Sequence, residues 1–237
     1  MGDNAKYCKA CAEVSLVEET NGYINAIETL KQREDVDSNA VYIIGHSMGG
    51  VFAPIIAQKT DIRGIISYGT IGSSFIEYLA KTRRTIGEAY KMTPVETDNL
   101  VKEFCECAGY YFVEKMTTAQ TANKKEACKD YLSVFDLRAR QYNDELYALS
   151  IPEIWSSYLG KVLFLWGSSN YISSKEDHII LNNTVNFYHK ERSIFKTIEN
   201  ADHGMNLAGS FQEAQKNQGT YNNEVGIIIL HWLKAIN

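Results

Sequence analysis

Residues 41–50 read VYIIGHSMGG, and this stretch decides how the rest of the chain is interpreted. Its first four residues are apolar and largely β-branched, which predicts a buried strand. A G-x-S-x-G motif follows from Gly45 to Gly49, and its small residues allow a sharp turn that exposes the hydroxyl of Ser47. The next residues are apolar and compatible with a helix. The order of strand, serine and helix predicts a nucleophile elbow, and the alternative is an ordinary glycine-rich turn with a solvated serine.

Further apolar runs predict strands at 64–68, 161–167 and 193–198, and amphipathic helices at 12–33 and 222–236. Strands that are apolar throughout and alternate with helices are typical of a parallel sheet covered on both faces. The interval 76–158 interrupts this pattern with charged residues, tyrosines and helix formers. We therefore expect an α/β core made of residues 1–75 and 159–237, with a helical insertion over 76–158.

The composition excludes several classes of protein. With 237 residues and 45% hydrophobic residues, the chain is able to bury a core. A net charge of −5 with interspersed signs provides no basic surface for nucleic acid. No stretch is long and apolar enough to span a bilayer. The first residues lack the apolar region of a secretion signal, which predicts a cytoplasmic protein.

The five cysteines are odd in number and scattered. Cys8 and Cys11 form one close pair, and Cys105 and Cys107 form another, but neither has a second pair nearby to complete a zinc site. We expect reduced thiols or one local disulfide, and neither a metal nor a cofactor.

A serine hydroxyl is a poor nucleophile until a base removes its proton. The candidate base is His203, in the loop that follows the strand predicted at 193–198. The carboxyl ends of parallel strands meet at one edge of a sheet, so we expect His203 to lie near Ser47. A solvated or capping histidine is the alternative.

The third member of such a triad is expected in the loop after residues 161–167. Asn170 occupies the position where an aspartate is expected. An asparagine is able to hydrogen-bond the imidazole, but it brings no charge and can hold the wrong tautomer. Glu176 and Asp177 are alternatives.

These motifs together resemble the α/β-hydrolase superfamily. Residues 45–50 are similar to the elbows of esterases, monoacylglycerol lipases and thioesterases, residues 162–170 to the acid strand, and residues 202–204 to the histidine loop. The order of Ser47, Asn170 and His203 matches the order of nucleophile, acid and histidine in that family. The resemblance implies that residues 76–158 form a cap over an active site and that catalysis needs no cofactor.

The N-terminal region departs from the family pattern, because several strands and an oxyanion-hole loop normally precede the elbow. Here only residues 1–40 precede Val41, and Gly2 and Asp3 resemble the end of that loop. We therefore expect an N-terminally truncated fold in which the Met48 N–H is one oxyanion donor and a second has no visible source. The strand at Val41 becomes a hydrophobic edge, which predicts that a second copy of the chain or a missing segment covers it.

Three functions remain open. The first is a serine hydrolase acting on a carboxylic ester or a related acyl group of a small-molecule substrate. The second is a catalytically impaired relative that binds a small molecule or a protein partner, and the third is a serine peptidase of the same fold. Arg83 and Arg84 are candidates for binding an acidic substrate group, and Tyr111 for lining an acyl pocket. A solvated helix face and packing of helices are the alternatives for these residues.

Overall fold

The computed structural model describes residues 12–216 and 219–236, which divide into two compact units. The first unit contains residues 12–22 and 75–149. The second contains residues 23–74 and 150–216 together with 219–236. The predicted insertion coincides with the first unit over most of its length. Residues 150–158 belong to the second unit, where the ring of Trp155 packs 4.8 Å from that of Phe164.

The second unit is built on a parallel sheet of four strands, which confirms the predicted fold class. Its strands are β1 (Tyr42–His46), β2 (Gly64–Tyr68), β3 (Lys161–Gly167) and β4 (Ser193–Ile198), and they pair in the order β1-β2-β3-β4. In the two central strands, Ile65 pairs with Val162 and Ile66 with Leu163, and all four side chains are fully buried. Burial on both faces explains why these strands are continuous apolar runs.

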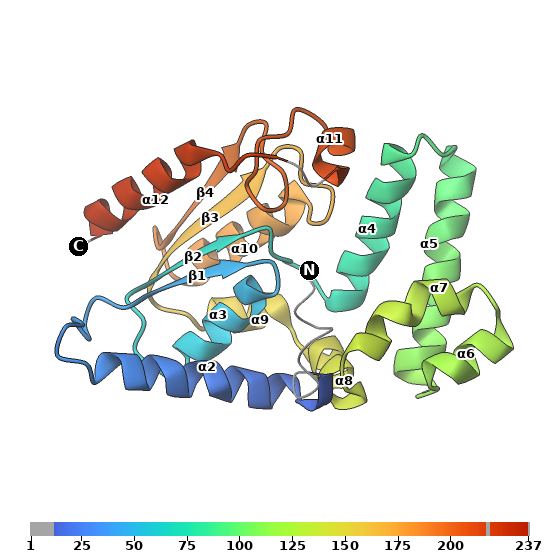
Figure 1. The fold of residues 1–237 in the computed structure, drawn as a ribbon, viewed down its shortest axis with the longest axis horizontal. Coiled ribbons are helices and arrows are strands. Elements are labelled where there is room, and N and C mark those ends of the chain that lie inside the picture. The colour runs from blue at the N-terminus through green and yellow to red at the C-terminus, as the bar shows by residue number, and fades with distance from the viewer. Residues whose placement is uncertain (1–11, 217–218, 237) are drawn as a thin grey trace. The chain divides into compact units, whose positions relative to one another are not determined.

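Helices cover both faces of the sheet. On one face lies α12 (Asn223–Ile236), whose Val225 and Trp232 pack with Leu163 and Leu165 (Figure 1). On the opposite face, α3 (Gly49–Ala57) contacts β1 and β2, and α10 (Lys175–Tyr188) contacts β3 and β4. The short α9 (Ile151–Ser156) contacts both of these helices. The short α11 (Phe211–Gln215) precedes α12, and α2 (Leu16–Lys31) contains residues of both units. No helix among the described residues has the length and apolar character needed to cross a bilayer.

The strand β1 lies at one edge of the sheet, as predicted, and Ile44 is 57% exposed there. The Ser47 N–H donates to the Tyr68 carbonyl, and the Val41 carbonyl accepts from the Arg63 N–H. Alternate residues of a parallel strand direct their backbone groups to opposite neighbours. The backbone of Ile44 therefore faces away from β2, where no other described strand pairs with it.

We expect this edge to promote self-association, as an uncovered apolar edge strand does. Replacing Ile44 with Lys should shift the chain toward monomer at high concentration, because the charge opposes pairing of strands. Ile194→Lys is the matched control, since Ile194 is 50% exposed on the strand at the opposite edge. Size-exclusion chromatography with light scattering measures the outcome. A wild-type chain that stays monomeric, or equal effects of both variants, would contradict the expectation.

The first unit contains helices and no strand among its described residues. Its elements are α4 (Phe75–Ala89), α5 (Pro94–Ala108), the π-helix η2 (Gly109–Val113), α6 (Thr118–Lys124), α7 (Cys128–Leu132), the 3-10 helix η3 (Ser133–Leu137) and α8 (Arg140–Ala148). A buried cluster that includes Phe104, Phe112, Leu132 and Phe135 forms its core.

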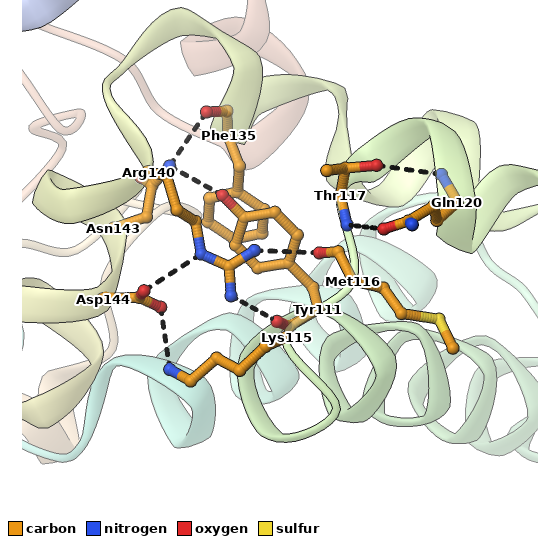
Figure 2. Close-up of polar contacts among 9 residues, drawn as sticks. All are labelled: Tyr111, Lys115, Met116, Thr117, Gln120, Phe135, Arg140, Asn143 and Asp144. Atoms are coloured by element: carbon orange, nitrogen blue, oxygen red, sulfur yellow. Dashed lines mark hydrogen bonds and ion pairs between the residues drawn. The ribbon is translucent and has the colours of Figure 1, made fainter.

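A polar network on Tyr111 joins η2 to α8 (Figure 2). The Arg140 guanidinium lies 4.0 Å from the centre of the Tyr111 ring and donates to the Tyr111 carbonyl at 2.6 Å. It also donates to the Met116 carbonyl and to Asp144. The Asn143 amide donates to the Tyr111 hydroxyl at 3.1 Å. The side chain of Tyr111 is therefore held from both ends within this unit.

A buried disulfide between Cys107 and Cys128 connects α5 to α7, and Cys105 is an exposed free thiol. Of the two alternatives for the cysteines, a disulfide is therefore correct for this pair, and Cys107 is not available to a zinc site. Cys8, Cys11, Gly2 and Asp3 lie outside the described residues.

Removal of the disulfide should destabilise the first unit. Its partners are 21 residues apart, and closing a loop of this length contributes about 3 kcal/mol in the chain-entropy model. The Cys107→Ser, Cys128→Ser double variant should therefore lose hydrogen-exchange protection in α5 and α7, whereas Cys105→Ser should not. All three tryptophans (Trp155, Trp166 and Trp232) belong to the second unit, so their fluorescence reports that unit separately. Unchanged protection in the double variant would contradict the expectation.

Candidate active site

Ser47 lies at the tip of a tight turn between β1 and α3. Its φ of 55° is in the left-handed region, which costs a non-glycine residue about 1–2 kcal/mol. A Cβ at Gly45 would lie 2.5 Å from the Gly49 carbonyl oxygen, so only glycine fits where the turn closes on itself. The sequence, the left-handed serine and the close backbone approach are those of a nucleophile elbow.

The N-terminus of α3 adjoins the serine. Met48 is the N-cap of this helix, and its carbonyl accepts from the N–H groups of Val51 and Phe52. The Met48 N–H makes no hydrogen bond to the described residues. Backbone N–H groups at a helix N-terminus stabilise negative charge, so this group is suited to bind an oxyanion.

His203 lies in a compact loop after β4. The carboxylate of Asp202 shapes this loop by accepting from the N–H groups of Gly204 and Asn206, both at 2.8 Å. The Asp202 N–H donates to the Asn206 carbonyl at 2.8 Å, and Ala201 pairs with Leu207. Asp202 is thus used within its own turn.

The histidine loop contacts the end of β1 and the residue after β2. The Nε2 of His46 donates to the His203 carbonyl at 3.0 Å, and the two rings are 4.7 Å apart. Gly69 has a φ of 62°, and a Cβ there would lie 2.9 Å from Cε1 of His203. The fold therefore brings His203 against the residue that directly precedes Ser47, at the carboxyl ends of β1 and β2.

The surroundings keep His203 neutral. Burial, followed by the charges of His46 and His178, lowers the pKa of His203 to about 3. Its Nδ1 is buried and has no hydrogen-bond partner among the described residues. His178 is fully buried, and burial lowers its pKa to about 4. His203 is therefore unprotonated at neutral pH and free to accept a proton, but no acceptor holds its Nδ1 when the ring becomes positively charged.

Asn170 is buried, and it makes its hydrogen bonds inside its own loop. Its Oδ1 accepts from the N–H groups of Ile172 at 2.9 Å and Ser173 at 3.1 Å, and its Nδ2 donates to the Ser173 hydroxyl at 2.7 Å. The assignment of Asn170 as the third triad member stays a prediction, and none of these hydrogen bonds supports it.

Neither of the two alternative acids hydrogen-bonds Nδ1 of His203. Asp177 is buried and accepts from the Gly72 N–H at 3.1 Å and from the Ser174 hydroxyl at 2.7 Å. It thereby fixes the start of α10 to the loop after β2. Glu176 is exposed at the first turn of α10. Their roles as acids likewise stay predictions.

The candidate substrate-binding residues all lie in the first unit. The Arg83 guanidinium lies 5.2 Å from the centre of the Phe104 ring, and its buried Nε has no hydrogen-bond partner in the described part of the chain. Arg84 is exposed and forms an ion pair with Asp98 at 3.4 Å. Tyr111 is buried in the core of the unit. Contact of these residues with a substrate stays a prediction.

Two residues that contact His203 are not among the site residues predicted from the sequence. For His46, its place beside Ser47 in the motif is the signal that identifies it. Gly69 is a single glycine after a strand, and no feature of the sequence distinguishes it. No group of three histidine, cysteine, aspartate or glutamate side chains suited to a metal ion occurs in residues 12–216 and 219–236.

No protein-family model and no curated protein matches the chain, but solved structures do. A protein assigned as the non-heme bromoperoxidase BpoC of Mycobacterium tuberculosis has a TM-score of 0.53 at 14% identity, with 97% of this chain and 78% of that one covered. The chain has the α/β-hydrolase fold. The same fold occurs in the monoacylglycerol lipase of Paleococcus ferrophilus, with a TM-score of 0.51, 13% identity and coverage of 94% and 77%. A thermophilic esterase of Thermogutta terrifontis has a TM-score of 0.51, 16% identity and coverage of 94% and 73%. At these identities the likeness shows the hydrolase fold alone, since one fold hosts many activities.

Asn170→Asp tests the third position of the site. Both oxygens of an aspartate can accept the hydrogen bonds that now hold Asn170 in its loop, so we expect the carboxylate to stay there. The variant should change the rate at which a fluorophosphonate probe labels Ser47 by less than about tenfold. In serine proteases, an acid that orients the histidine contributes on the order of 10⁴-fold to the rate. A gain of a thousandfold or more would show that the side chain turns toward His203.

Proposed function

We propose that this chain is a serine hydrolase that cleaves small carboxylic esters or related acyl substrates. The observation that carries the proposal is the contact between the histidine loop and the elbow, because a serine becomes nucleophilic only beside a base. In this reaction the Oγ of Ser47 attacks the carbonyl carbon while His203 accepts its proton. The Met48 N–H stabilises the oxyanion, and His203 returns the proton to the leaving alcohol. Water then releases the acid by the same steps.

The low pKa of His203 makes it a weak base that is unprotonated at neutral pH. A pKa of about 3 keeps its acceptor nitrogen free at neutral pH, yet it lowers the driving force for proton transfer. We therefore expect slow turnover. The described residues favour no peptide substrate over an ester, so the peptidase alternative has no separate support.

A second function is favoured by one observation, the lack of a partner for Nδ1 of His203. Without a group that stabilises the imidazolium, the site is able to bind an acyl compound without cleaving it. In this alternative the elbow and the helix N-terminus remain as a binding site for a small molecule with a carbonyl or carboxylate group.

A fluorophosphonate probe separates these functions. We expect the Ser47 Oγ to displace fluoride and form a covalent bond to phosphorus, and Ser47→Ala should abolish the labelling. Ser157→Ala is the control, because Ser157 is an exposed serine at the end of α9. Mass spectrometry detects the label. If the folded wild-type chain is not labelled, the result would favour the binding function.

The pH dependence of labelling tests the assigned base. Because the pKa of His203 lies well below its ordinary value, the neutral base is fully present from about pH 5 upward and is lost only as the pH falls toward 3. We therefore expect a rate that is nearly constant between about pH 5 and pH 8. A rate that falls below an apparent pKa near 6.5 would show that the active histidine is an exposed one.

A further inference from the structure

His46 is the last residue of β1, and its side chain contacts both the neighbouring strand β2 and the histidine loop. Its Nε2 lies 3.0 Å from the His203 carbonyl oxygen. Because a carbonyl only accepts, Nε2 carries the proton, which fixes the tautomer of the ring. On its other side the ring stacks on Tyr68, with centroids 4.8 Å apart and planes at 19°.

The same contacts set the position of Ser47. The Tyr68 carbonyl accepts from the Ser47 N–H at 2.9 Å. Tyr68 thus holds the serine through its backbone and the ring of His46 through its side chain, and His46 in turn holds His203. The rings of Tyr68, His46 and His203 form one series, in which His46 and His203 are 157 residues apart in the sequence.

No other polar side chain performs this task in the described part of the chain. Nδ1 of His203 has no hydrogen-bond partner. Asp202 accepts from its own turn, and Asn170 hydrogen-bonds within its own loop. On the side of β2, the contact with His203 is Gly69, which limits where the ring can lie but provides no side chain to hold it.

We propose that His46 is a positioning residue, which fixes His203 beside Ser47 by donating its Nε2–H to the His203 carbonyl and by packing against the His203 ring. This inference deepens the proposed hydrolase function and rests on it. In an acid-dependent triad the third residue orients the imidazole from Nδ1; here the orientation comes from the other side, through the backbone of the base. His46 lies between Gly45 and Ser47 in the motif, and its position in the sequence alone does not indicate this role.

Two substitutions separate the hydrogen bond from the ring. His46→Phe keeps a flat ring on Tyr68 but removes the donor, and His46→Gln removes the ring but places an amide N–H at a similar reach. We expect His46→Phe to lower the second-order rate constant of fluorophosphonate labelling by about 10- to 100-fold, since a misplaced base costs about this much. His46→Gln should retain the rate within about fivefold, since it restores the hydrogen bond. Equal labelling of wild type and His46→Phe would overturn the proposal.

His189→Phe is the matched control, because Nε2 of His189 donates to the Ser156 carbonyl at 2.6 Å in the same unit. It loses the same kind of hydrogen bond away from the elbow, so its labelling should equal that of the wild type. A loss equal to that of His46→Phe would show a general effect on folding and overturn the proposal. Thermal unfolding of each variant identifies any global change.

Titration of His203 by histidine-ring NMR does not depend on activity. Both His46 variants remove the neighbouring charge, so a difference between them does not arise from that charge. An apolar phenylalanine that left His203 in place would keep its pKa low, so a rise in His46→Phe reports movement of the ring. We expect its pKa to stay low in His46→Gln and to move toward the ordinary value in His46→Phe, as the loop releases the ring to solvent. Identical titrations in the two variants would overturn the positioning role. A wild-type chain that is not labelled, but whose variants titrate as expected, would contradict the hydrolase function and leave the positioning role supported.

Discussion

The backbone of residues 45–49 turns so tightly that the chain contacts itself, and the arrangement of the second unit depends on this constraint. The turn places a serine in a left-handed conformation and starts α3 immediately after β1. This turn sets the direction in which α3 runs over the sheet, where it contacts β1 and β2. A strained turn persists only where the surrounding structure holds its backbone in place. Here the buried central strands and the hydrogen bond from the Ser47 N–H to the Tyr68 carbonyl hold it.

Most of the architecture was accessible from the sequence because all four strands are largely apolar runs, although only β2 and β3 are buried on both faces and the edge strands β1 and β4 are partly exposed. The strands at 64–68 and 193–198 were predicted to the residue, and β1 begins one residue later than the apolar run. Periodicity likewise located α12, and the charged residues and helix formers of residues 76–158 predicted helices there. Spacing alone did not predict which cysteines pair, because Cys107 and Cys128 approach only when α5 and α7 pack together.

The site was predictable in part. Motifs identified Ser47 and His203 as candidates, and parallel topology explains why their loops meet at one edge. The hydrogen-bond partners of Asn170 could not be predicted from the sequence. A polar side chain in a loop either bonds groups of its own loop or reaches across the site, and the loop conformation decides between the two. The contact of His46 with His203 depends on register across the whole sheet. It cannot be read from the adjacent residues.

The disulfide of the first unit has a consequence for how the protein matures. A chain newly made in a reducing environment holds two separate thiols, and α5 and α7 then depend on apolar packing alone. Cross-links of this kind form and persist mainly where the surroundings are oxidising. The stability of this helical unit therefore depends on the redox poise around it, because reduction of the Cys107–Cys128 bond would leave α5 and α7 joined by packing alone.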